Sequence, residues 1–107
     1  MRLLQFLAVC LVSLAAVSCG WVELTAEGEK VRVLTASEVA KCQRLGKTTA
    51  SVTEKVAGVR RHDEQILSEL TIIARNAAIN LDGDTVVAVG EEKDGKQVFD
   101  VYRCVPR

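Results

Sequence analysis

The sequence predicts a small α+β domain over residues 30–107, with the order β-β-α-β-β. We expect one helix packed on an antiparallel or mixed sheet, pinned by one disulfide. Apolar side chains recur at helical spacing after Asp63, and the segments on either side of that stretch show the alternating or continuous apolar patterns of strands. The residues that remain when residues 1–18, described below as an export signal, are set aside are too few for a second domain.

Two strands are expected before the helix. Lys30 to Leu34 alternates polar and apolar side chains, which predicts a half-buried strand. Residues 35–39 are expected to form a loop or a short helical turn, and residues 42–53 the second strand. Residues 58–62 are expected to be a loop, whose basic cluster Arg60-Arg61-His62 is interpreted as solvated rather than as a phosphate site.

The helix is predicted from Asp63, which is expected to cap its start. The pair Asp82-Gly83 supplies a residue that tolerates positive φ at its end. Spacings of four, three, four and four residues predict one buried face made of Ile66, Leu70, Ile73, Ala77 and Leu81.

Two more strands follow the helix. Thr85 to Val89 has no polar alternation, which predicts a strand buried on both faces or nearly so. The pair Asp94-Gly95 is favoured in tight hairpin turns, and residues 97–104 are expected to return as the last strand. Cys104 then lies at the end of the last strand, within reach of Cys42 at the start of the second.

Residues 1–18 have the order of a bacterial export signal. Arg2 gives a basic start, residues 3–14 are almost wholly apolar, and small residues precede Cys19. The stretch Ala16-Val17-Ser18-Cys19 resembles the lipobox of bacterial lipoproteins, with Ala16 where Leu is usual. It predicts lipidation of Cys19, which then becomes the first residue of the mature chain.

Two other outcomes of processing stay open at this point. Ordinary cleavage after small residues would leave a soluble periplasmic protein with a free Cys19 thiol. An uncleaved anchor fits less well, because the apolar run over residues 3–17 is shorter than the ~20 residues that span a bilayer.

The cysteine count favours lipidation. Cys10 leaves with the signal, and if Cys19 carries lipid, Cys42 and Cys104 remain as an even pair. Such a pair in an oxidising compartment most simply forms a disulfide. Closing that loop stabilises the fold by about 4 kcal/mol in the chain-entropy model.

Residues 19–29 are expected to be the lipidated cysteine and a short tether. Gly20 to Glu29 shows no sustained helical or strand period and spans at most about 35 Å when extended. Gly20 replaces the Asp that often retains enteric lipoproteins at the inner membrane. We therefore expect an outer-membrane lipid anchor with the domain facing the periplasm.

Residues that carry chemistry are sparse. The chain has 14 basic and 14 acidic side chains and no long block of one charge, which argues against a nucleic-acid partner. His62 is the only histidine and falls in an expected loop, and Asp82 and Asp84 are interpreted as a turn rather than a calcium loop. We expect no catalytic residues, no metal site and no cofactor. A reduced Cys42 acting as a nucleophile is the least favoured hypothesis.

The sequence also resembles a known family. Several stretches are similar to the pattern of short proteobacterial lipoproteins classed as a domain of unknown function: Cys42 with Leu45-Gly46, Leu70, Ala74-Arg75-Asn76-Ala77-Ala78, Asp84-Thr85-Val86-Val87 and Tyr102-Arg103-Cys104. That family is distantly similar to the globular domain of the Rcs stress-sensor lipoprotein of the outer membrane. The resemblance implies the fold, export and a Cys42–Cys104 bridge, but no catalytic residues. This chain has one cysteine pair where that sensor has two disulfides, and it lacks the sensor's proline-rich tether.

These observations predict a membrane-anchored envelope lipoprotein whose domain contacts other envelope proteins, in sensing or envelope maintenance. The lipid on Cys19 supplies the membrane contact. The alternative is a binding module for a periplasmic small molecule or glycan, which a compact pocket with convergent polar groups would favour.

Overall fold

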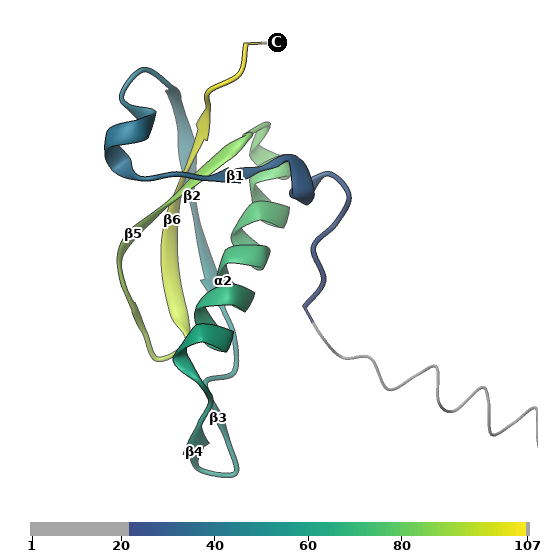
Figure 1. The fold of residues 1–107 in the computed structure, drawn as a ribbon, viewed down its shortest axis with the longest axis vertical. Coiled ribbons are helices and arrows are strands. Elements are labelled where there is room, and N and C mark those ends of the chain that lie inside the picture. Colours follow the sequence, from purple (N-terminus) through teal and green to yellow (C-terminus); the bar gives the residue numbers. More distant parts are fainter. Residues whose placement is uncertain (1–21, 107) are drawn as a thin grey trace, which may run out of the picture.

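One α-helix packs on one face of a four-stranded mixed sheet, and a separate two-stranded hairpin projects from one end (Figure 1). This arrangement, in a computed structural model that describes residues 22–106, confirms the predicted α+β class. The predicted signal peptide and Cys19 lie outside the described residues. The elements are η1 (Gly28–Lys30), β1 (Arg32–Val33), η2 (Ala36–Val39), β2 (Gln43–Ser51), β3 (Lys55–Val56), β4 (Val59–Arg60), α2 (Asp63–Ala78), η3 (Ile79–Leu81), β5 (Thr85–Lys93) and β6 (Lys96–Arg103).

The sheet has the strand order β1-β5-β6-β2. Strand β1 pairs in parallel with β5, while β6 is antiparallel to both β5 and β2, so the sheet is mixed. The β5–β6 hairpin turns at Asp94 and Gly95, which have φ values of 52° and 76°. The predicted Asp-Gly turn is therefore confirmed, because both central residues of such a turn need positive φ.

The helix begins at Asp63 as predicted, but its buried face is rotated from the expected one. The core residues of α2 are Ile66, Leu70, Ala74 and Ala78. Ile73 packs at the margin of the core, and Leu81, in η3, is 38% exposed. Small alanine side chains at the contact let the helix lie close to the sheet, and the larger Ile73 fills the space beside them.

Both ends of α2 differ in detail from the expectation. The N-cap position is His62, without a side-chain hydrogen bond, and Asp63 is the first helical residue. The carboxylate of Asp63 binds Arg60 instead of the helix N-terminus. At the other end, η3 continues the helix to Leu81, and Asp82 takes the left-handed conformation with φ of 59°.

Strand β5 is buried over only part of its length. Thr85, Val86 and Val87 are buried, but Ala88 and Val89 are exposed, so the prediction of burial on both faces is wrong for the second half. Strand β1 extends only along Thr85 and Val86, and an open cleft separates Ala88 from Leu67 of α2. Neither β1 nor α2 therefore covers this half of the strand.

The stretch expected to be a loop over residues 58–62 contains a strand. Lys55 pairs with Arg60 and Val56 with Val59, around a turn at Ala57 and Gly58 with φ values of 52° and 80°. We name residues 55–60 the β3–β4 hairpin. Two paired residues on each side are too few to produce a visible alternating pattern in the sequence.

The described part of the predicted tether, residues 22–29, lies against α2. The side-chain amide of Asn76 donates to the carbonyl of Glu23 at 2.8 Å and accepts from the N–H of Thr25 at 3.0 Å. Arg75 donates to the carbonyls of Glu29 and Val31. The structure therefore differs here from a free tether, because two polar side chains of the helix bind its backbone.

Cys42 and Cys104 form the expected disulfide, with their Cα atoms 4.5 Å apart. The adjacent residues Gln43 and Arg103 are paired in the β2–β6 ladder, so the bridge closes that ladder at one end. It joins positions 62 apart in the sequence. Cys42 is bonded and is no free thiol in this structure.

Candidate protein-interaction surface

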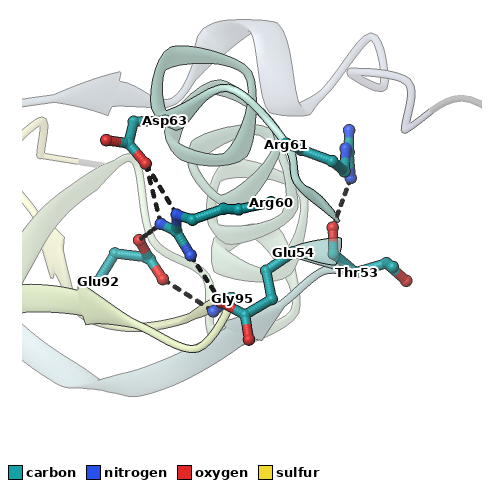
Figure 2. A network of polar contacts seen from close by, with 7 residues as sticks. All are labelled: Thr53, Glu54, Arg60, Arg61, Asp63, Glu92 and Gly95. Atoms are coloured by element: carbon teal, nitrogen blue, oxygen red, sulfur yellow. Dashed lines mark hydrogen bonds and ion pairs between the residues drawn. The ribbon is translucent and has the colours of Figure 1, made fainter. Parts of the chain in front are cut away.

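A cluster of charged side chains joins the β3–β4 hairpin to the body of the domain (Figure 2). The guanidinium of Arg60 lies at its centre and binds three carboxylates. It donates to Glu54 at 2.6 Å and to Glu92 at 2.6 Å, and it contacts Asp63 at 3.0 Å. We name these four residues the Arg60 cluster. Its members come from β4, the segment before β3, the first turn of α2 and strand β5.

A bulge in β5 directs Glu92 into this cluster. Between the pairs Val89–Val98 and Lys93–Lys96, three residues of β5 face the single residue Gln97 of β6. Gly90 takes a φ of 68° there. Bulges of this kind bend a strand and change the direction of the side chains that follow. Glu92 consequently turns inward, and its side chain is 9% exposed.

Gln97 compensates the backbone groups that the bulge removes from the ladder. Its side chain is buried, with 5% of the residue exposed. Its amide nitrogen donates to the carbonyl oxygens of Val89 at 2.8 Å and Gly90 at 3.0 Å. A buried carbonyl without a hydrogen-bond donor costs free energy. The two hydrogen bonds from Gln97 offset that cost and so stabilise the bulge in the folded state.

Glu92 is held ionised by its surroundings. One carboxylate oxygen accepts from the backbone N–H of Gly95 at 2.8 Å and the other from Arg60, and these hydrogen bonds lower the pKa of Glu92. The bonds to Glu92 and Asp63 in turn raise the pKa of Arg60. The ion pair between Arg60 and Glu92 is therefore present at neutral pH.

Arg61 attaches the β3–β4 hairpin to the rest of the domain at a second place, next to the Arg60 cluster. It donates to the backbone carbonyl of Thr53 at 2.7 Å and forms an ion pair with Glu69 of α2. Its backbone N–H also donates to the carbonyl of Glu54 at 2.7 Å. Arg60 remains exposed, in keeping with the interpretation of this cluster as solvated, but Arg60 and Arg61 each also bind partners from other segments.

The tip of the β3–β4 hairpin is apolar and points away from the body (Figure 1). Val56 is 63% exposed and Val59 is 69% exposed. Ala57, between them, is a non-glycine residue with positive φ, a conformation that costs such residues free energy. The chain therefore presents an exposed, conformationally strained apolar tip on a base held by ion pairs.

An open cleft of about 490 Å³ lies beside the Arg60 cluster, between α2 and the exposed half of β5. One cationic side chain and three carboxylates line it, so the net charge of its lining is negative. Leu67, which is 46% exposed, supplies an apolar wall. The lining residues are Arg60, Asp63, Leu67, Ala88, Gly90, Glu91, Glu92 and Gln97. We name this the acidic cleft.

The other residues singled out from the sequence lie elsewhere. His62 is exposed at the start of α2. The carboxylate of Asp84 accepts from the N–H groups of Cys104 at 2.8 Å and Val105 at 2.9 Å, so it holds the end of β6 in place. Within residues 22–106, no group of three or more His, Cys, Asp or Glu side chains is placed to hold a metal ion. No helix in the same part of the chain is long and apolar enough to cross a bilayer.

Sequence reasoning missed this surface because its parts are far apart in the chain. The local signal was Gly58, which tolerates positive φ and lies between two valines, whereas Ala57 beside it does not favour a tight two-residue turn. The carboxylate partners of Arg60 come from positions 54, 63 and 92, and no local pattern connects them.

Comparison with known proteins places the chain in a family. No curated protein matches it. Among solved structures it is similar to the solution NMR structure of a secreted protein of Salmonella typhimurium LT2, with 15% identity and a TM-score of 0.45, over 79% of this chain and 75% of that chain. A family model described as a domain of unknown function, DUF4156, matches residues 22–104. Because that match spans the whole sheet and helix, the chain belongs to the DUF4156 family of unknown function.

Proposed function

We propose that the protein is an envelope lipoprotein, anchored through Cys19, whose domain binds another envelope protein through the β3–β4 hairpin. The observation that carries the proposal is the exposed apolar tip on a base held by ion pairs between side chains. Large exposed apolar side chains that gather at one place mark interaction surfaces more often than scattered ones do.

The attachment of the hairpin supports this role. A two-stranded hairpin is marginally stable by itself in water. Here Arg60 binds three carboxylates and Arg61 binds Thr53 and Glu69, so the hairpin is ordered before any partner arrives. An ordered binding element loses less conformational entropy on association, which favours affinity.

The export signal and the lipobox-like stretch support the anchored location. The described N-terminal segment, bound to α2 from Glu23 onward, leaves only residues 19–22 to bridge the lipid and the domain. Such a segment spans at most about 14 Å when extended. In this proposal the domain works close to the membrane surface.

Site-specific photo-crosslinking in cells tests the interaction. A benzoylphenylalanine replaces Val56 at the tip, and a matched control replaces Leu81, an exposed apolar residue beyond the opposite end of α2. We expect a discrete crosslinked envelope protein from the Val56 position that is absent from the Leu81 position. Crosslinks of the same kind and yield from both positions would contradict the proposal.

Intact mass of the protein purified from its native membrane tests the anchor. We expect the mass of residues 19–107 plus acyl chains, with two cysteines that are alkylated only after reduction. A mass without lipid would overturn the anchor while leaving the crosslinking result to decide the interaction.

A further inference from the structure

The edge of strand β5 is paired over only its first two residues. Arg32 and Val33 of β1 lie opposite Thr85 and Val86, and the last bond of this ladder runs from the N–H of Leu34 to the carbonyl of Val86 at 3.1 Å. Figure 1 shows β5 continuing beyond β1 along the border of the sheet. Among residues 22–106, the rest of that strand pairs with β6 on one side and with no strand on the other.

Ala88 presents its backbone at this open edge. The carbonyls of Asp84 and Val86 both accept from β1, so the carbonyls of even-numbered residues in this stretch point away from β6, although the N–H of Asp84, at the start of the strand, donates to Tyr102 of β6. Ala88 continues that alternation, before the bulge that begins after Val89. Its N–H and C=O are therefore available to an added strand, and its side chain is small and exposed.

Strand β1 ends before it reaches this position. At Thr35 it turns from the sheet into η2, where a capping box fixes the departure. The N–H of Thr35 donates to the carboxylate of Glu38 at 2.9 Å, and the Thr35 side chain accepts from the N–H of Glu38. The site beside Ala88, in line with β1, is thus left vacant by a defined turn.

The acidic cleft adjoins the same edge and determines which segment fits. Its lining carries Asp63, Glu91 and Glu92 against the single cation Arg60. Leu67 and Ala88 give an apolar surface between the charges. A strand added here would place alternate side chains into the cleft, where cationic and apolar groups find complementary partners.

The opposite edge of the sheet has the other charge. Among residues 22–106, strand β2 is also unpaired on its outer side, but it carries Lys47 and Arg44, of which Arg44 forms an ion pair with Asp100 of β6. Lysine on an edge strand discourages strand addition, and a basic segment meets repulsion there. The charge difference between the two edges therefore favours β5 for a basic segment.

We propose that β5 accepts an extended basic segment of a protein partner as an added strand beside Ala88, with its cationic side chains in the acidic cleft. This inference rests on the proposed interaction role and names the chemistry of the partner. It needs neither the lipid anchor nor the hairpin tip, so its test is separate from theirs.

The test uses the purified full-length mature protein and a fluorescent peptide of about seven residues that alternates Lys and Val, within the usual length of a strand. A matched peptide alternates Glu and Val. Fluorescence anisotropy is expected to show saturable binding of the Lys peptide that weakens with added salt, and none of the Glu peptide. Binding of both peptides alike, or of neither, would overturn the proposal.

Two proline variants test which edge strand of the sheet, β5 or β2, binds the peptide. A88P removes the outward N–H of β5 without removing a donor from the β5–β6 ladder, a position where edge strands tolerate proline. T49P does the same on β2, since Val52 donates to Gly95 and odd-numbered residues there point outward. We expect A88P to weaken binding about tenfold and T49P to leave it unchanged. Equal effects of the two variants would exclude the β5 edge.

A charge variant keeps the proposal testable if A88P fails to fold. E91K reverses an exposed charge in the cleft, and E29K reverses an exposed charge in η1 as its control. E91K is expected to weaken binding about tenfold at low salt and to reduce its salt dependence, whereas E29K is not. A crosslink at Val56 with no peptide binding would overturn this inference alone, and the reverse result would overturn the hairpin role alone.

Discussion

The guanidinium of Arg60, on β4, donates to the carboxylate of Glu92, on β5, at 2.6 Å across 32 positions of sequence. This bond joins the projecting hairpin to the main sheet, and the same carboxylate also binds the N–H of Gly95 in the β5–β6 turn. The geometry of one hairpin is therefore coupled to that of the other through a single acidic side chain.

Replacing Arg60 with lysine should loosen the β3–β4 hairpin without unfolding the domain. A single ammonium group cannot reproduce the planar fork that reaches three carboxylates. We expect R60K to raise the hydrogen-exchange rate of the Val56 and Val59 amides about tenfold, while the amides of the β2–β6 ladder stay unchanged. Unchanged exchange at the hairpin would show that Arg61 alone holds it.

Loss of the disulfide should lower stability substantially. The bridge closes a loop of 62 positions, worth about 4 kcal/mol in the chain-entropy model. The double variant C42S/C104S should show this loss in urea unfolding, and the wild type under reducing conditions should match it. A difference below about 1 kcal/mol would indicate that the unfolded state is already compact.

Alanine substitutions at Gly95 and Gly58 should separate the effect of a steric clash on stability from the effect of backbone strain. Both have positive φ, but a Cβ on Gly95 would lie 2.3 Å from the carbonyl oxygen of Val52, whereas no atom of residues 22–106 lies within 4 Å of one on Gly58. We expect G95A to cost about 2 to 3 kcal/mol more than G58A, which should cost about 1 kcal/mol. Thermal unfolding of both variants measures the difference.

Asp84 should make stability fall at acid pH. Burial raises the pKa of Asp84, but hydrogen bonds from the N–H groups of Cys104 and Val105 and from Thr85 outweigh it, so the pKa lies below its ordinary value of 3.8. A depressed folded-state pKa contributes stability that is complete above 3.8 and is lost as the pH falls through the folded-state value. D84N should therefore be less stable than wild type at neutral pH, with the difference shrinking in that acidic window. The control D94N, at an exposed turn position, should follow the wild-type profile in urea unfolding at each pH.

Asn76 should control how firmly the N-terminal segment is attached. N76A removes the bonds to Glu23 and Thr25 and should cost about 1 kcal/mol. Faster proteolysis between residues 22 and 29 should accompany that loss. N80A removes an exposed amide in η3 and serves as the control. Equal proteolysis of the two variants would show that Arg75 suffices to hold the segment.

The elements that were predictable are those whose signals are local. The apolar repeat beginning at Ile66 predicts α2, and Asp94-Gly95 predicts the last turn, because helix periodicity and turn chemistry depend on neighbouring residues. The rotation of the buried face from Ile73 toward Ala74 was not predictable in this way. It depends on how closely the helix approaches the sheet, which single-residue hydrophobicity does not encode.

By itself, the sequence determined the α+β class, the helix and the Cys42–Cys104 pair, since periodicity and the cysteine count need no knowledge of distant neighbours. Only the tertiary structure decided that Arg60 binds Glu92, that the bulge turns Glu92 inward, and that Asn76 holds residues 23–25. These contacts join positions tens of residues apart, and a charge or amide alone does not specify which distant partner it will meet. The candidate interaction surface is made of such contacts, which is why it emerged only with the fold.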